Sequence, residues 1–377
     1  MFRDHTAAKM NKAKRKYISE ELTNSKKICY ENVKEAQNYE KDCTITEVIN
    51  LGIPHVGEQI FSCLDTDDLI QCLEVSKTWK ILIEPVLLKR CKGKIFEACK
   101  DGKTAVVKIL LANLKGRKTE LNTKDTEGMT AFTWACKNGH TDVVKLLMDH
   151  SGSKIITKTK VGKLAFYWAC YKGRIDVVKL LLHHSGNKNI DFNVSYYGMT
   201  PFTNACSNGD INVVKLLLDH SDNKNIDLND GDQDGWTPFI RACFHGHVHV
   251  VKLLLDQADI KNIDLNAKDE TGGTAFTSAC GNGYIDVVKL LLDHSDIKNI
   301  DLNAKTENGL TGFIVACGNG YIDVVKLLLD HSDIKNIDLN AKNYKGWTGF
   351  KGACINAHKD IVKLLLDNSD VKNINLD

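Results

Sequence analysis

The sequence contains little proline, little net charge and no long apolar segment. Four prolines occur among 377 residues, and the net charge is +2. Such a balance gives no general electrostatic reason to expect nucleic acid as a partner. No run approaches the ~18 apolar residues that cross a membrane, and the polar N-terminus, MFRDHTAAKMNKAKRKY, lacks the apolar core of a secretory signal. We therefore expect neither a nucleic-acid nor a membrane partner, and a location in the cytoplasm with the nucleus as a second location.

Motifs of catalytic sites are also missing. The chain contains no GxxxxGK[ST] phosphate-binding loop, no GxGxxG turn and no Ser/His/Asp arrangement of catalytic spacing. His245, His247 and His249 are the densest group of potential metal ligands, but a glycine turn separates them, and a metal site needs converging ligands with a supporting shell. We expect no catalytic residue, no metal and no cofactor, and hence a protein that is not an enzyme.

The chain instead contains a repeat with a period near 37 residues. Its first marker is VVKLLL, which starts at Val177, Val213, Val250, Val287 and Val324, with weaker copies at Val106, Val143 and Ile361. Its second marker is Ala-Cys, whose cysteines are Cys99, Cys136, Cys170, Cys206, Cys243, Cys280, Cys317 and Cys354. A period of this length predicts a stack of similar units, each burying its apolar face on its neighbours.

The cysteines follow the repeat rather than a disulfide pattern. Eight of the thirteen cysteines occupy one position of the repeat. Successive repeats place these residues in equivalent small sites, which we expect to be buried. We interpret them as reduced core thiols of an intracellular protein.

One repeat, 269–305, shows the expected local structure. Thr274 is placed to cap a short helix, and two other repeats carry Thr-Pro here, in which proline suits the first helical position. Gly283 then allows a left-handed turn, and Asp286 begins a second, strongly apolar helix where its charge suits the helix dipole. Gly272 supports a tight turn at the tip of a hairpin. Each repeat therefore reads as helix, turn, helix and extended loop.

This pattern resembles the ankyrin repeat, which has the form D-x-x-G-x-T-P-L-H-x-A followed by a Gly-His turn and a V-x-L-L-L helix. The best match is DQDGWTPFIRACFHGHVHVVKLLLDQ, residues 232–257. The resemblance covers about eight repeats and implies a solenoid over residues 93–377. Most repeats have phenylalanine before the motif's histidine, and the histidine itself is replaced. We therefore expect phenylalanine packing to replace its hydrogen bonds between repeats, and about four extra residues, around IKNI, to lengthen each loop.

The segment before the repeats has a different pattern. Residues 53–80, IPHVGEQIFSCLDTDDLIQCLEVSKTWK, resemble the F-box, although Ile53-Pro54 lies one residue too close to Phe61 and the acidic residue that usually follows proline is missing. The resemblance implies a small helical bundle at 46–92 that docks on the Skp adaptor of a cullin-based ubiquitin ligase. The residues expected to hold the adaptor contact or the bundle core are Pro54, Ile60, Phe61, Leu64, Leu69 and Trp79. The alternative is that all six are core residues of a cap on the ankyrin stack.

Differences among the repeats indicate a target-binding surface. The apolar positions of the second helices barely change, whereas the hairpin tips and first helices of repeats two to five carry bulky, divergent residues. These are Trp134, Tyr167, Trp168, Tyr171, Tyr196, Tyr197, Trp236, Arg241 and Phe244. Tyr, Trp and Arg dominate the binding energy of protein interfaces. The alternative is that some of these aromatic residues pack between neighbouring hairpins.

Together these observations predict an all-α protein with a basic, mostly disordered tail at 1–45, an F-box-like helical module at 46–92 and an ankyrin array at 93–377. The resemblances imply a non-catalytic, monomeric substrate receptor of an SCF-type ubiquitin ligase, with a Skp adaptor, the cullin core and an unknown target protein as partners. One alternative is an ankyrin interaction scaffold without a ligase role. Another is a parasite or viral effector that redirects a host ligase.

Overall fold

The computed structural model describes residues 64–73, 77–91, 94–113, 121, 123–151, 160–184, 192–196 and 198–376. The described chain is all-helical, with one isolated β-bridge between Tyr196 and Met199. It divides into two compact units, 1–131 and 132–377. The predicted tail at 1–45 lies outside the described residues. No helix in the described segments is long and apolar enough to span a membrane.

The first compact unit holds two helices of the predicted F-box-like module and both helices of repeat one. These are α4 (Thr66–Cys72), α5 (Lys77–Cys91), α6 (Ile95–Lys100) and α7 (Thr104–Asn113). Helix α5 packs against both α4 and α7. Lys103 also binds Asp67 at 2.6 Å, between Nζ and Oδ1. The module therefore packs directly on the first repeat.

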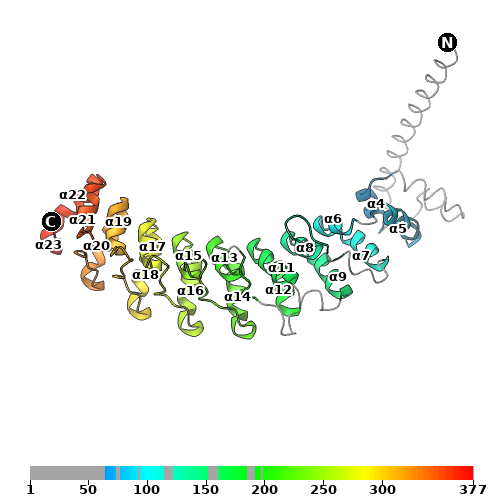
Figure 1. Ribbon diagram of the computed structural model, residues 1–377, viewed down its shortest axis with the longest axis horizontal. Helices are drawn as coiled ribbons and strands as arrows, with labels where there is room; N and C mark the ends of the chain where they lie inside the picture. The colour runs from blue at the N-terminus through cyan, green and yellow to red at the C-terminus, as the bar shows by residue number, and fades with distance from the viewer. Residues whose placement is uncertain are drawn as a thin grey trace, which may run out of the picture. The chain divides into compact units, whose positions relative to one another are not determined.

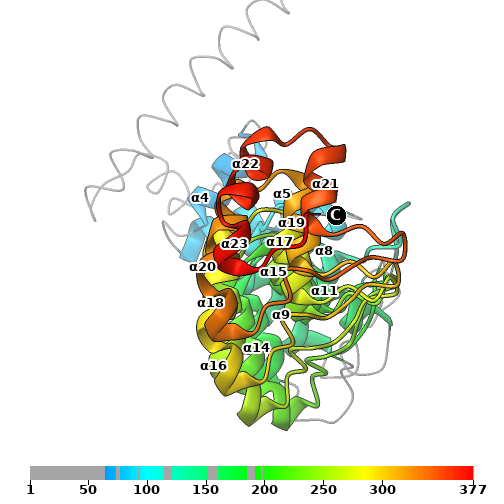
Figure 2. The ribbon, with the colours of Figure 1, turned by 90° about the vertical axis from the view of Figure 1, so that its left-hand side faces the viewer.

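The second compact unit contains repeats two to eight, each with a first and a second helix, and in repeat eight a short third helix, α23, follows. The helices are α8 (Ala131–Asn138), α9 (Thr141–Ser151), α11 (Lys160–Tyr171), α12 (Ile175–His184), α13 (Pro201–Asn208), α14 (Ile211–Lys224), α15 (Pro238–Phe244), α16 (Val248–Lys261), α17 (Ala275–Gly281), α18 (Ile285–Lys298), α19 (Gly312–Asn319), α20 (Ile322–Lys335), α21 (Gly349–Ile355), α22 (Lys359–Asp367) and α23 (Ser369–Lys372). From repeat three to repeat eight, first helices pack on first helices and second helices on second helices (Figure 1). Viewed along the stack, the first helices lie between the second helices and the hairpin loops (Figure 2).

The local signals of the sequence form the expected caps and turns. The Thr274 hydroxyl accepts the backbone N–H of Thr277, and Thr200 and Thr237 cap their helices in the same way ahead of proline. Gly283 and Gly272 have φ of 74° and 76°, values that only glycine adopts without strain. The predictions of capping threonines and turn glycines are therefore confirmed.

In repeats four to seven the extra residues lengthen the second helix rather than the loop, so the predicted longer loop is wrong there. Helices α14, α16, α18 and α20 each contain fourteen residues and end at an asparagine in the left-handed conformation, such as Asn299 with φ of 50°. His220, His294 and His331 therefore lie before the last turn of α14, α18 and α20. The sequence DIK continues a helix easily, and asparagine tolerates the left-handed cap.

Two rows of polar contacts join consecutive repeats. In the first row, a loop asparagine bridges to the next repeat: Asn303 Nδ2 donates to the Asn336 carbonyl at 2.8 Å, and Asn303 Oδ1 accepts the Asp338 N–H at 2.8 Å. The members of this asparagine ladder are Asn193, Asn229, Asn266, Asn303 and Asn340. In the second row, a lysine such as Lys298 binds an aspartate of the preceding repeat, Asp259, at 2.6 Å.

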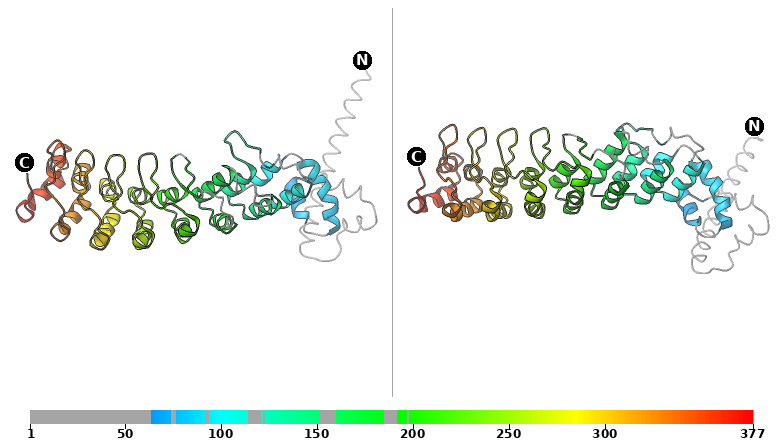
Figure 3. Two further views of the ribbon diagram at one scale, coloured as in Figure 1. Left: turned by 60° about the horizontal axis from the view of Figure 1, so that its bottom comes forward. Right: turned by 90° about the horizontal axis from the view of Figure 1, so that it is seen from below.

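The hairpins also bond to one another. The backbone N–H of Glu270 donates to the Asp234 carbonyl at 3.0 Å, and that of Glu307 donates to the Thr271 carbonyl at 2.7 Å. The loops therefore stand as a row of parallel hairpins (Figure 3). Because each contact recurs one repeat later, the stack holds its hairpins in a regular array.

The apolar core runs through the stack as repeated layers. Phe166, Phe202, Phe239, Phe276 and Phe313 are among the largest fully buried side chains. Seven of the eight repeat cysteines are buried and unpaired, as expected. Cys354, in the last of the eight repeats, is the exception and is exposed.

Candidate functional site

The predicted adaptor-binding residues are only partly described. Leu64 and Leu69 are buried, Leu69 completely. Trp79 lies in α5, but its side chain falls outside the described part of the chain, as do Pro54, Ile60 and Phe61. Where the structure describes this set, it therefore places the residues in the bundle core. Whether the set contacts an adaptor remains a prediction.

Local hydrogen bonds hold α4 at the start of the described module. The Asp65 carboxylate caps the helix by accepting the backbone N–H groups of Asp67 and Asp68 at 3.0 and 2.9 Å. The Arg90 guanidinium of α5 donates to the Leu64 carbonyl. Ile81, a large apolar residue of α5, lies outside this core with 70% of its surface exposed. Ile81 was not singled out in the sequence, where it is one of many aliphatic residues at helical spacing.

Five of the predicted target-binding residues converge on one cluster in repeats two to four. Four of the five lie on the first helices α8 and α11, and the fifth lies in the hairpin before α13. The members, which we call the aromatic cluster, are Trp134, Tyr167, Trp168, Tyr171 and Tyr196. The Trp168 ring lies 5.4 Å from Tyr171 and 5.7 Å from Tyr196, and both contacts are edge-on. Tyr167 stacks on Tyr171 at 6.2 Å. Such edge-on and stacked pairs hold rings rigidly, which lowers the entropy cost of binding through them.

A lysine that the sequence did not single out completes the aromatic cluster. The Lys137 ammonium lies 4.4 Å from the centre of the Trp134 ring and 4.1 Å from that of Trp168. Lys172 lies 5.0 Å from the Tyr171 ring. Cation–π contacts of this kind orient both partners. Lysine is common in this sequence, so only the fold distinguishes these two from the rest.

Members of the aromatic cluster differ in their access to solvent. Tyr167 is only 2% exposed, and its hydroxyl accepts a hydrogen bond of 2.6 Å from Asn204 Nδ2. Tyr171 is 38% exposed. The Trp168 indole N–H is buried and has no hydrogen-bond partner. Tyr167 is therefore a buried ring that packs against Trp168, Tyr171 and Tyr196, whereas the Tyr171 ring is accessible to solvent. Tyr197 lies outside the described residues.

The remaining three predicted residues form a second cluster in repeat five, the Trp–Arg cluster. It comprises Trp236, Arg241 and Phe244. The Arg241 guanidinium lies 4.4 Å from the Trp236 ring centre, and the rings of Trp236 and Phe244 are 4.4 Å apart. All three side chains are half-buried. A guanidinium held over an indole presents a rigid, amphipathic surface.

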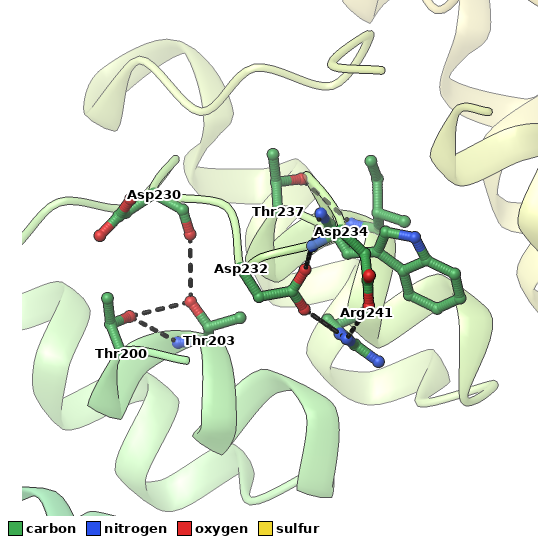
Figure 4. A network of polar contacts seen from close by, with 9 residues as sticks. Thr200, Thr203, Asp230, Asp232, Asp234, Thr237 and Arg241 are labelled. Carbon is green, nitrogen blue, oxygen red and sulfur yellow. Dashed lines mark hydrogen bonds and ion pairs between the residues drawn. The ribbon is translucent and has the colours of Figure 1, made fainter. Parts of the chain in front are cut away.

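One carboxylate fixes the geometry of the Trp–Arg cluster (Figure 4). Arg241 Nε donates to Asp232 Oδ2 at 2.7 Å, while Asp232 Oδ1 accepts the N–H groups of Asp234 and Trp236, each at 3.0 Å. The Asp232 side chain is only 3% exposed. Sequence reasoning missed Asp232, because aspartate at a hairpin start is common to several repeats and only repeat five places an arginine against it.

The neighbouring histidines His245 and His247 make contacts within the fold. His245 and His247 stack at 5.9 Å, and His247 Nε2 lies 2.8 Å from the Ser207 carbonyl oxygen. Burial, the adjacent His247 and Arg241 lower the pKa of His245. No group of three metal-binding side chains occurs among the residues that the structure describes.

Comparison with known families agrees with these two parts of the structure. The model for ankyrin repeats (three copies) matches overlapping segments at 95–195, 187–269, 224–305, 260–343 and 297–376. The F-box-like model matches residues 54–91. A comparison with curated proteins gave no match. The chain therefore combines an F-box-like module with ankyrin repeats. Both matched families are interaction modules that are typically non-catalytic.

Proposed function

This chain belongs to the ankyrin repeat family and carries an F-box-like module, and from that premise we propose that it is a substrate receptor of an SCF-type ubiquitin ligase. The F-box-like module binds the Skp adaptor, and the ankyrin array binds the target protein. The observation that carries the proposal is the order of the two matches, 54–91 followed at once by repeats from 95. A receptor needs one part for the ligase core and a second part for its target.

The structure of the first compact unit supports the adaptor-binding half. A module of this size buries too little apolar surface to be very stable by itself, and here α5 gains a further neighbour in α7. The Lys103–Asp67 contact adds a second tie between the module and repeat one. A module attached in this way would hold the start of the array at a fixed position relative to a bound adaptor.

The two side-chain clusters support the target-binding half. Tyr171, Trp236 and Arg241 belong to the residue types that dominate interface energy, and each is held by neighbouring side chains. Rigid aromatic and arginine anchors lose little conformational entropy when a partner binds. We propose that the target contacts both clusters through the first helices and hairpins of repeats two to five.

In this role the chain itself performs no bond-making step. It supplies proximity between a target lysine and the charged ubiquitin enzyme of the complex. The proposed setting is a reducing compartment, the cytoplasm or nucleus. The unpaired thiols of the described residues support that setting, since buried pairs of cysteines in an oxidising compartment are commonly bridged.

The adaptor half is tested by co-expressing the full chain with a Skp adaptor and measuring co-elution and affinity. Phe61→Asp is the test variant. Leu64 is unsuitable, because a charge at this buried position would unfold the bundle and remove binding for a trivial reason. Ile81→Asp, at an exposed position of α5, is the matched charge control. We expect a one-to-one complex that Phe61→Asp weakens at least a hundredfold while the thermal unfolding of the chain is retained.

The same experiment decides the second candidate, an ankyrin scaffold whose F-box-like bundle only caps the array. The packing of α5 on α7 and the burial of Leu64 and Leu69 also suit a cap. No adaptor binding by a folded wild-type chain would reject the receptor and leave the scaffold. Binding of a host adaptor from another organism, stronger than that of the organism's own, would identify an effector that redirects a host ligase.

The target half is tested by quantitative affinity capture. Tyr171→Ala combined with Trp236→Ala should remove a protein that the wild-type chain retains. Tyr344→Ala is the matched control, since Tyr344 is 80% exposed in repeat eight, away from both clusters. If the control variant loses the same protein and the double variant retains it, the proposed surface is wrong.

A further inference from the structure

A row of exposed aliphatic side chains lies on the second helices, outside both clusters. The row, which we call the aliphatic ridge, consists of Ile260, Ile297, Ile334 and Val371. Their exposed fractions are 73%, 80%, 75% and 79%. Ile260, Ile297 and Ile334 occupy the same position, the last but one residue of α16, α18 and α20, and Val371 takes the corresponding position in α23. These four side chains contribute little to the core.

The fold does not require an aliphatic residue at the ridge position. In repeat four, the same position of α14 is Asn223, which is also exposed, although α14 has the same length and the same left-handed asparagine cap as α18. The buried positions beside it, such as Leu217 and Leu254, keep their apolar character in both repeats. The change from asparagine to isoleucine in repeats five to seven, and to valine in repeat eight, is therefore a change of surface chemistry alone.

Carboxylates border the aliphatic ridge. In repeat six, Asp293 lies one turn before Ile297 and Asp296 directly before it, and both are exposed. The lysine of the following repeat that binds Asp296, Lys335, has a side chain only 12% exposed. Asp296 itself is 72% exposed. The lysines therefore lie under the row while the carboxylates face solvent, and the same arrangement holds at Asp259 and Asp333.

The spacing of the ridge selects the secondary structure of a partner. Neighbouring second helices pack side by side through α16, α18 and α20, and packed helices lie about 8–10 Å apart. An α-helix rises about 10.5 Å in seven residues and returns to the same face. An extended chain covers about 10 Å in three residues, which places the next side chain on its opposite face. Only a helix lying across the repeats meets each ridge residue with one face.

We propose that the aliphatic ridge is a docking site for a basic amphipathic helix, with an apolar residue at every seventh position and lysine or arginine beside it. The apolar residues cover Ile260, Ile297, Ile334 and Val371, and the cations lie against the exposed aspartates. The charge of the border carries this choice of partner. Asp259, Asp296 and Asp333 already have lysine partners. The exposed Asp256, Asp293 and Asp330 have no ion pair among the described residues, and an uncharged or acidic helix would desolvate them without supplying a cation. This site is independent of the proposed target and adaptor surfaces.

The test uses the full chain and a dye-labelled synthetic helix of about 28 residues, long enough for four ridge contacts. The peptide carries leucine at every seventh position flanked by lysine, and a matched peptide carries glutamate in place of lysine. Fluorescence anisotropy gives both affinities. We expect the lysine peptide to bind at least tenfold more tightly than the glutamate peptide, with a difference that shrinks as salt is raised.

The chain supplies its own matched variants. Ile260→Asn, Ile297→Asn and Ile334→Asn together install the residue that repeat four already has, so the fold is retained, as circular dichroism and thermal unfolding will verify. We expect at least a tenfold loss of affinity for the lysine peptide. Asn223→Ile, which extends the ridge by one repeat, should raise the affinity. Unchanged affinity in the folded triple variant, or equal binding of the two peptides, would overturn the proposal.

Discussion

Repeats two to five and repeats six to eight share one framework and differ in what they present on it. Both regions have buried phenylalanine and cysteine at equivalent positions, and the asparagine ladder runs through both. The first region carries Trp168 and Arg241 on its first helices, whereas the equivalent position in repeat six is Ser278. The aliphatic ridge begins at Ile260 in repeat five and continues through the whole of the second region. Stacking and recognition therefore use separate positions of the same repeat.

The largest expected effect tests the part of the framework that both regions share. Burial raises the pKa of Cys136, Cys170, Cys206, Cys243, Cys280 and Cys317 above the usual value of 9.0. Above pH 9 the unfolded chain therefore loses thiol protons that the folded chain keeps, so stability falls as pH rises, by roughly 1.4 kcal/mol per pH unit per thiol. Urea unfolding between pH 8 and 11 will measure this slope.

Single substitutions then separate the buried thiols from other alkaline groups. Cys206→Ala and Cys280→Ala, one in each region, should each reduce the slope of stability against pH above pH 9 by the same amount. Ser278→Ala, which removes no thiol, should leave the slope unchanged. An equal reduction with Ser278→Ala would contradict the assignment of the slope to the buried thiols.

Replacing a core phenylalanine should lower the free energy of unfolding by nearly the same amount in the two regions. Phe202 and Phe313 are each 1% exposed. We expect Phe202→Ala and Phe313→Ala each to lower the free energy of unfolding by about 3–5 kcal/mol, from lost burial and a residual cavity. Urea denaturation followed by circular dichroism gives both values. A large loss in only one region would show that the two regions do not share one core.

A substitution in the Trp–Arg cluster should distinguish the two regions. Arg241→Ala leaves the Asp232 carboxylate, with 3% exposure, without its cation, and we expect a loss of about 1–3 kcal/mol. The matched variant, Ser278→Ala in repeat six, should change stability by less than about 0.5 kcal/mol. Equal effects of the two variants would mean that Asp232 does not depend on Arg241.

The smallest expected effect concerns the asparagine ladder. Asn303→Ala removes two hydrogen bonds to the next repeat, and Asn229→Ala removes the equivalent pair in repeat four. Because a typical hydrogen bond contributes about 0.5–1.5 kcal/mol, we expect each variant to lose about 1–2 kcal/mol. Thermal unfolding of the two variants should agree. A loss confined to the variant in repeat six would show that the ladder is not a common element.

Much of the candidate site could be anticipated from residue type, but its internal order could not. Divergence among repeats picked out Trp168, Trp236 and Arg241, which the structure gathers into two clusters. It did not reveal that Tyr167 is buried against Asn204, or that Lys137 lies over two indole rings. These facts depend on which side chain the adjoining repeat places opposite, and similar residues occur at many other positions of the sequence.

The sequence by itself determined the repeat, its caps and its core. A capping threonine, a turn glycine and a buried phenylalanine act within one repeat or at a fixed period, so their pattern is readable along the chain. The tertiary structure alone decided that the extra residues extend the second helices, that asparagines bridge the loops, and that Cys354 is exposed while Cys317 is buried. Each of these outcomes depends on contacts between residues of different repeats, and only the stacked fold brings those residues together.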